Sequence, residues 1–176
     1  HGRFERFVLG YVCVFGCHLY VRLAFYRSVL DVGVALVLEF EREELVGDVV
    51  HYSAEIRVGD GPFDVIGIHR VVKETRPYRP IRARESMFMV HGSSGLFDNY
   101  LRYASSLAQS PAVVFAESDV DVWGIDLGWS LVPPGEEDLS FFESWGLDRD
   151  LRDLEIALSV ARLTRLFTGN GWRKMD

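Results

Sequence analysis

The chain has few residues that could cross-link it or bind a metal through sulfur. Its 176 residues include two cysteines and three methionines. Both cysteines, Cys13 and Cys17, lie in one apolar run, so no disulfide framework is predicted. With His18 they form Cys-x-x-x-Cys-His, which is one residue longer than the haem attachment spacing. We read them as small apolar residues one helical turn apart and expect no cofactor and no metal.

Positive charge is also scarce. The sequence has 19 lysines and arginines against 26 aspartates and glutamates, which gives a formal net charge of -7. Such a chain lacks the basic character of nucleic-acid-binding domains, so we expect no nucleic acid partner, and its acidity mainly favours solubility. Apolar residues make up 48% and charged residues 26%, as in globular proteins. The length fits one domain.

The N-terminal segment, residues 1–45, has no uninterrupted apolar run long enough for an ordinary membrane-spanning helix. Residues 7–26 are strongly apolar, but Arg22 lies within them, and an arginine there is costly. A signal peptide needs only about 7 to 15 apolar residues after a basic start, and residues 7–17 fit that description. The segment is therefore interpreted as an export signal or a membrane anchor, with membrane association as its consequence. A buried helical pair or poorly determined terminal sequence are the alternatives.

A hairpin is predicted after this segment. Residues 50–58 alternate between apolar and polar side chains, which is the period of a half-buried strand. Residues 59–62 form a glycine- and proline-containing turn, and residues 63–73 continue as an apolar, β-branched run. The two runs are predicted to pair as antiparallel strands. Two prolines in residues 75–84 then exclude a central strand and indicate an exposed connection.

Strands and helices alternate in the remainder of the chain. Residues 86–90 and 120–125 are predicted strands, and residues 111–117 and 150–167 are predicted helices. A further helix is predicted between them, because five apolar residues share one helical face: Leu96, Tyr100, Leu101, Ala104 and Leu107. This alternation predicts an α/β fold, in which an antiparallel hairpin is followed by parallel strand–helix units.

Two motifs carry a resemblance to a known family. Residues 87–92, Met-Phe-Met-Val-His-Gly, resemble the third strand and His-Gly turn of the α/β-hydrolase family. The run Val122-Trp123-Gly124-Ile125-Asp126 resembles that family's fourth strand with its terminal aspartate, and residues 150–167 resemble the helix that leads to its nucleophile strand. The resemblance covers about residues 48–176. It implies that residues 46–176 are the N-terminal half of an α/β-hydrolase domain, with an incomplete sheet.

The resemblance also implies a candidate site. In this family the loop after the third strand supplies one backbone N–H of the oxyanion hole, and Ser93 is the matching residue here. His91, Gly92 and Ser94 would form the supporting turn. The alternative is an ordinary strand-to-helix turn with Ser94 as a helix cap. The family's catalytic histidine follows the nucleophile in chain order, so His91 and Asp126 are interpreted as structural.

The nucleophile motif of this family, Gly-x-Ser-x-Gly, is absent from the sequence. In residues 92–95 the glycines are one residue too close together. Residues 128–130 read Gly-Trp-Ser, but Pro133 and Pro134 follow where a helix would have to begin. Since the chain also begins at His1, we expect that both natural ends are missing and that the sequence stops before the nucleophile. The segment alone would then be inactive.

Function is therefore predicted only as a class. The resemblance implies a serine hydrolase that acts on a small-molecule ester or acyl substrate through an acyl-enzyme, as esterases and lipases do. The same fold also hosts other reactions and non-enzymatic proteins. Two alternatives remain. One is a non-catalytic α/β interaction domain tethered to a membrane by the N-terminal segment. The other is a Rossmann-like nucleotide-binding domain, although its Gly-x-Gly-x-x-Gly fingerprint is absent from the turn after residues 86–90.

Overall fold

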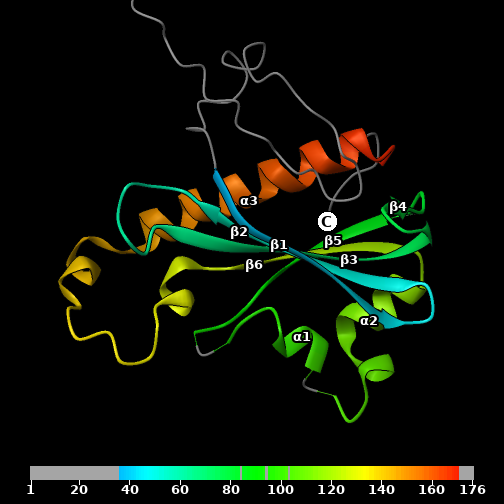
Figure 1. Cartoon of the computed structure of the whole chain (residues 1–176), viewed down its shortest axis with the longest axis horizontal. Coiled ribbons are helices and arrows are strands. Elements are labelled where there is room, and N and C mark those ends of the chain that lie inside the picture. The colour runs from blue at the N-terminus through cyan, green and yellow to red at the C-terminus, as the bar shows by residue number, and fades with distance from the viewer. Residues whose placement is uncertain (1–35, 84, 94, 103, 171–176) are drawn as a thin grey trace, which may run out of the picture.

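The sheet is the centre of the structure, a computed structural model that describes residues 36–83, 85–93, 95–102 and 104–170. The strand order is β1-β2-β3-β6-β5, and the short strand β4 pairs with β3. Helices lie on both faces of this sheet (Figure 1). The strands are β1 (Leu36–Val46), β2 (Val49–Arg57), β3 (Val65–Arg76), β4 (Arg79–Pro80), β5 (Glu85–Val90) and β6 (Val120–Asp126). The helices are α1 (Asn99–Arg102), α2 (Pro111–Glu117) and α3 (Leu147–Phe167), with 3₁₀ turns η2 (Leu107–Gln109), η3 (Gly128–Leu131) and η4 (Ser140–Ser144).

The predicted fold class is confirmed. β2 and β3 form the antiparallel hairpin, β3 pairs antiparallel with β6, and β5 pairs parallel with β6. The chain thus crosses from β5 through α1 and α2 to β6, which inserts between β3 and β5. Of the predicted N-terminal segment 1–45, residues 1–35, which include the cysteine motif, lie outside the described residues, whereas residues 36–45 belong to β1 of the sheet. No helix in the described part of the chain is long and apolar enough to cross a membrane.

The hairpin follows its predicted alternation, but its loop is longer than predicted. β3 begins at Val65 rather than Phe63, so residues 58–64 connect the strands. The Asp64 carboxylate accepts a hydrogen bond from the Gly61 N–H at 2.8 Å, and the Val58 N–H donates to the Asp64 carbonyl at 2.8 Å. These bonds close the loop locally and replace strand pairing there.

Strand β1 was not predicted. It pairs antiparallel with β2 and carries exposed Glu39, Glu41 and Glu43 at alternate positions. Charged side chains are typical of sheet edges, where they oppose pairing with other chains. Residues 39–44 therefore belong to an edge strand, which was not predicted because the run is so highly charged.

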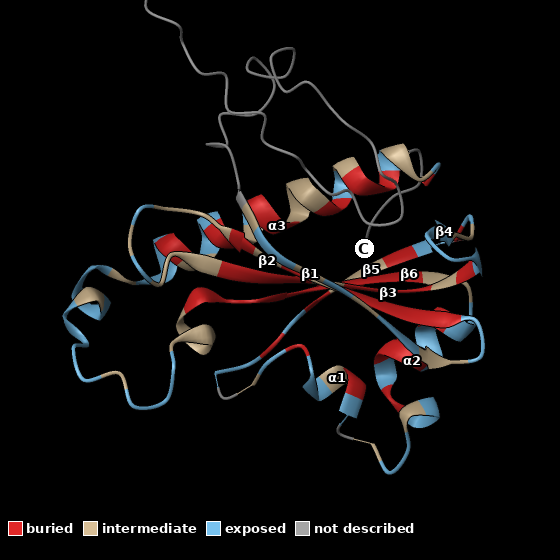
Figure 2. Cartoon of the chain, in the orientation of Figure 1, coloured by how far each residue is buried: buried red, intermediate tan, exposed pale blue. Residues whose placement is uncertain are grey.

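Two apolar cores hold the layers together, one on each face of the sheet (Figure 2). Trp123 of β6 is fully buried in the core beneath α3, with Tyr52 of β2 and Ala157 of α3. On the other face Phe97, Leu101 and the buried side of α2 cover Val71 and Val122. Because β6 contributes to both cores, its position beside β5 is fixed from two sides.

The helix predicted from Leu96 to Leu107 is much shorter in the structure. The described residues of this range form the single turn α1, Asn99–Arg102, followed by the start of η2, and Leu96 is exposed. Phe97 N–H is bonded to the side chain of Asp126 instead of to a helical carbonyl, and Ser106 has extended backbone angles. Serine, aspartate and asparagine, which are frequent here, favour such local bonds over helix interiors. The helices predicted at 111–117 and 150–167 are confirmed, and α3 begins earlier, at Leu147.

Candidate functional site

The turn after β5 lies where the family resemblance places the candidate site. Val90 pairs with Ile125 in the parallel ladder, so β5 and β6 end at the same edge of the sheet. Beyond Val90 the chain turns, and the Gly95 N–H donates to the Gly92 carbonyl at 3.2 Å. Gly92 and Ser93 are exposed, whereas His91 is buried. Ser94 lies outside the described residues.

The backbone at Ser93 is open to an approaching ligand. Among the residues that the structure describes, none accepts a hydrogen bond from the Ser93 N–H. Apart from its chain neighbours, no described atom would lie within 4 Å of a methyl group placed on Gly92. An amide in an exposed residue, next to a residue without a side chain, is compatible with donation to a ligand oxygen.

Both ring nitrogens of His91 are engaged by main chain. The Leu127 N–H donates to Nε2 at 3.1 Å, and Nδ1 lies 2.9 Å from the Gly92 carbonyl oxygen. A neutral ring with its proton on Nδ1 satisfies both contacts. The ring also packs against the edge of Trp129, with centroids 5.2 Å apart. His91 thereby links the candidate turn to the loop after β6, which is the kind of role expected of a structural histidine.

Ser130 approaches His91 but does not form a nucleophile pair with it. The Ser130 Oγ lies 3.5 Å from His91 Nε2. The same hydroxyl donates to the Leu127 carbonyl at 2.7 Å, so its proton points away from the histidine. Since Nε2 already accepts the Leu127 N–H, it cannot act as a base toward Ser130 in this arrangement.

Asp126 ties the candidate turn to the sheet. It is buried at the end of β6, where Oδ1 accepts the Phe97 N–H at 2.5 Å and Oδ2 lies 2.9 Å from His69 Nε2. Burial alone would raise the pKa of Asp126. The hydrogen bond and charge of His69, together with the Phe97 N–H, outweigh burial and hold that pKa below its usual value. The ionised carboxylate therefore joins β6, β3 and the turn.

Two histidines beside Asp126 were missed by sequence reasoning. His51 Nε2 of β2 lies 3.0 Å from His69 Nδ1 of β3, and the His69 ring stacks on Phe97 with centroids 4.6 Å apart. Burial, then the charges of His69 and Arg102, lower the pKa of His51 to about 3. A neutral His51 can donate its Nε2–H to His69, which then donates its own Nε2–H to Asp126. The only sequence signal was a histidine on the polar side of each hairpin strand.

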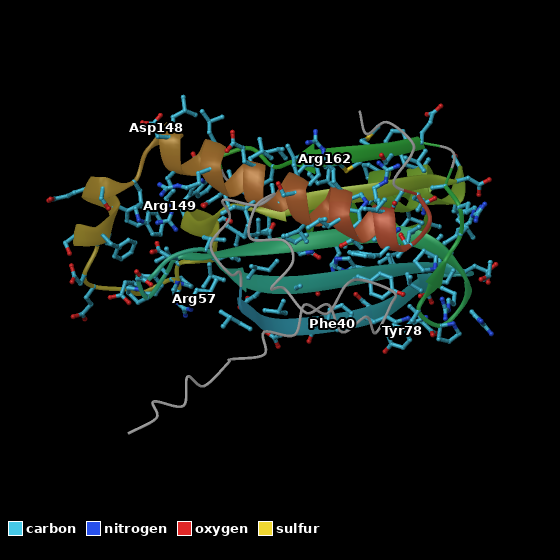
Figure 3. The ribbon with its side chains drawn as sticks, turned by 90° about the horizontal axis from the view of Figure 1, so that it is seen from above. Phe40, Arg57, Tyr78, Asp148, Arg149 and Arg162 are labelled. Carbon is cyan, nitrogen blue, oxygen red and sulfur yellow. The ribbon has the colours of Figure 1, made fainter. Side chains whose placement is uncertain are left out.

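Described residues line a cavity beside Asp126 and another beside the hairpin loop. One of about 150 Å³ is lined by His69, Asp126 and three glutamates, Glu39, Glu41 and Glu55. The other, of about 380 Å³, lies between the hairpin loop, η4 and the first turn of α3, where Figure 3 labels Arg149. In it Arg149 is already paired with Asp64 at 2.6 Å and stacked 3.4 Å above the Trp145 ring. No group of three or more His, Cys, Asp or Glu side chains within the described ranges could hold a metal ion.

Comparison with known proteins supports the fold and goes no further. No family model and no curated protein matches the chain. A solved structure that does match is a putative lipase from Sulfolobus solfataricus, with a TM-score of 0.54 and 17% sequence identity. The match covers 75% of this chain but only 40% of the lipase chain. The fold of this chain is therefore α/β-hydrolase-like.

Proposed function

We propose that these residues form the oxyanion side of a serine hydrolase that cleaves small ester or acyl substrates through an acyl-enzyme. The observation that carries the proposal is the open Ser93 amide, which follows the strand at the parallel edge of an α/β-hydrolase-like sheet. Ser93 N–H would donate to the carbonyl oxygen under attack. The second donor in this fold is the N–H of the residue after the nucleophile.

The contacts around Ser93 suit that chemistry. Negative charge develops on the substrate oxygen as the carbonyl carbon is attacked, and a donor held in place beforehand needs no reorganisation at that moment. The turn is held on one side by the bonds of His91 to Leu127 and Gly92, and on the other by the Phe97 N–H bond to Asp126. One such donor contributes about 3 kcal/mol of transition-state stabilisation.

The proposal assigns the nucleophile, acid and catalytic histidine to parts of the full-length protein outside these 176 residues. No Gly-x-Ser-x-Gly occurs in the sequence, and Ser130 directs its hydroxyl to the Leu127 carbonyl. The chain also spans 40% of the putative lipase that it resembles. On this proposal the 176 residues alone have no hydrolytic turnover.

The Rossmann-like alternative has less support. Nucleotide-binding domains of that kind have a mostly parallel sheet and bind the pyrophosphate at the start of a helix. Here the described strands include a single parallel pair, β5 with β6, and the helix after the turn, α1, has four residues.

Labelling with a fluorophosphonate probe tests the proposal. The full-length protein should react at one serine, which peptide mapping should place in a Gly-x-Ser-x-Gly motif outside residues 1–176. Heat-denatured protein is the control for nonspecific reaction and should not be labelled. A folded full-length protein that does not react contradicts the proposal, as does labelling of Ser130.

A further inference from the structure

We propose that His69 is a positioning residue for the Ser93 turn and acts on it through Asp126. The inference rests on the proposed function, because it gives the role of His69 in the same oxyanion site. Among the described residues, His69 forms hydrogen bonds with His51 and Asp126, and the Asp126 carboxylate is its link to the turn. Phe97, whose N–H that carboxylate holds, is four residues beyond Ser93 in the chain.

Each oxygen of the Asp126 carboxylate bonds to a different residue. Oδ1 holds the Phe97 N–H, and Oδ2 accepts from His69 Nε2. The terminal torsion of an aspartate is soft, so one hydrogen bond alone leaves the carboxylate free to rotate. The second bond, from His69, fixes the plane of the carboxylate and keeps Oδ1 directed at Phe97. His69 therefore determines how firmly this end of the turn is held.

Two glycines provide the space for this arrangement. Gly67 stands opposite Asp126 in the ladder, and a Cβ there would lie 3.2 Å from both Asp126 Oδ2 and His69 Nε2. A Cβ on Gly124 would lie 2.1 Å from the Phe97 ring, which covers His69. A side chain at either glycine would displace a member of the link. The strands are thus shaped around the histidine, the aspartate and the phenylalanine together.

His51 selects the tautomer of His69 that can bond to Asp126. A neutral His51 donates from Nε2 to His69 Nδ1, which leaves the His69 proton on Nε2. Glu43 lies 3.9 Å from His51 Nδ1 and is itself paired with Arg102 at 2.9 Å. The other charged groups near His69 are Glu39, Glu41 and Glu55, which line the cavity with it and Asp126.

The hydrogen bonds that join His69 and Phe97 to Asp126 should be lost on acidification. A proton added to His69 leaves its Nε2–H bond to Asp126 in place and only reverses the bond to His51. A proton added to Asp126 removes the charge that holds both donors. Because the pKa of Asp126 lies below its usual value, the link persists through neutral and mildly acidic pH and is lost on stronger acidification. Loss of His69 should therefore extend the acid sensitivity of the site to higher pH.

The test uses the full-length protein with His69→Phe, which keeps a stacked ring but removes the donor, and His69→Gln, which restores an N–H. Val72→Ala is the matched control, because Val72 is buried on the same strand but in the core under α3, on the face of the sheet opposite Phe97. Three quantities are measured: the fluorophosphonate labelling rate between about pH 3 and pH 8, so that the range includes the protonation of Asp126; the exchange rate of the Phe97 amide hydrogen; and the Tm.

We expect His69→Phe to slow labelling about tenfold to a hundredfold, as small displacements of an oxyanion donor do, and to accelerate exchange at Phe97. The labelling rate of His69→Phe should also decline at higher pH than that of the wild type. His69→Gln should restore most of the rate and of the protection. Val72→Ala should lower the Tm while leaving the labelling rate and Phe97 exchange unchanged. If His69→Phe does not fold, His69→Asn replaces it, since its shorter amide mimics Nδ1 rather than Nε2.

Two results overturn the inference. One is that the Phe97 amide hydrogen exchanges as slowly in His69→Phe as in the wild type. The other is slower labelling that follows the Tm equally in the His69 and Val72 variants, which is the pattern of a merely structural residue. A wild-type protein that is never labelled removes the proposed function, and with it the oxyanion role, whereas the exchange data still show separately whether His69 holds the turn.

Discussion

At the residue scale, Asp126 couples the stability of the protein to pH. Its pKa is lowered in the folded state, so the stability it contributes is complete above the unfolded carboxyl pKa of about 4 and is lost as the pH falls through the lower folded value. We expect Asp126→Asn to reduce the free energy of unfolding by about 1–3 kcal/mol at pH 7 and by less at pH 3. Urea unfolding of both proteins measures this. An equal loss at both pH values would contradict it.

Because His51 is kept neutral in the folded protein, it should make the protein less stable at acidic pH. Its folded pKa of about 3 lies below the ordinary histidine value of about 6.5, so the unfolded state binds a proton more readily. Stability should therefore fall as the pH is lowered from about 6.5 toward 3, with a slope of up to about 1.4 kcal/mol per pH unit from this group. In His51→Gln that slope should be smaller in urea titrations over the same window. Parallel slopes would rule out a buried neutral His51.

Gly124 and Gly92 should differ in their tolerance of a side chain. A Cβ at Gly124 meets the Phe97 ring at 2.1 Å, whereas a Cβ at Gly92 meets nothing within 4 Å. Gly124→Ala should lower the free energy of unfolding by about 1–3 kcal/mol through overpacking. Gly92→Ala should change it by less than about 0.5 kcal/mol, as surface substitutions do. Thermal unfolding of the two variants makes the comparison, and equal losses would mean that Phe97 is not packed on β6 as described.

At the scale of the elements, one buried ion cluster joins α3 to the sheet. Arg70 of β3 donates to both carboxylate oxygens of Asp121 in β6, at 2.7 and 3.0 Å, and Arg165 of α3 lies 3.4 Å from the same carboxylate. All three side chains are almost completely buried. Removing the carboxylate takes away an anion that both buried guanidinium groups contact, which is strongly destabilising.

Asp121→Asn should accordingly cost about 3–5 kcal/mol. The matched control is Asp98→Asn, which breaks the exposed pair with Arg102 and should cost less than about 1 kcal/mol. Chemical denaturation of both variants measures the difference. Similar small losses in the two would show that the cluster does not hold α3 to the sheet.

The elements that were predictable from sequence are those with strong local patterns. Strand β2 has apolar side chains at every second position, β3 begins with a β-branched apolar run, and α2 begins with a proline in its first turn. Strand β1 was missed because its acidic face hid the alternation. The helix predicted after residue 95 failed because a long-range bond, from Phe97 to Asp126, fixes the chain where periodicity favoured a helix.

The candidate site was predictable only in part, for a related reason. His91, Gly92 and Ser93 follow an apolar strand directly, so a family motif places them. His51 and His69 are brought close to Asp126 by the register of β2, β3 and β6. In that register Ser53 lies opposite His69, and Gly67 lies opposite Asp126. Nothing local in the sequence specifies that register. The link between His69 and Asp126, 57 residues apart, therefore required the structure.

At the scale of the whole molecule, the candidate turn depends on both layers. The core under α3 and the core under α2 fix β6 between β3 and β5. β6 in turn holds the loop after β5 through Asp126, and the residue after β6, Leu127, holds His91. The open amide of Ser93 is thus supported from the sheet rather than by the turn alone. This is the basis for expecting it to stay in place during a reaction.

The most direct test of this account compares Ser93→Pro with Ser93→Ala in the full-length protein, by the rate of fluorophosphonate labelling. Proline removes the backbone N–H, whereas alanine removes only the hydroxyl and keeps that donor. The account predicts that Ser93→Pro slows labelling about a hundredfold or more, and that Ser93→Ala is labelled at close to the wild-type rate. Equal rates in folded Ser93→Pro and wild type would contradict an oxyanion role for this turn.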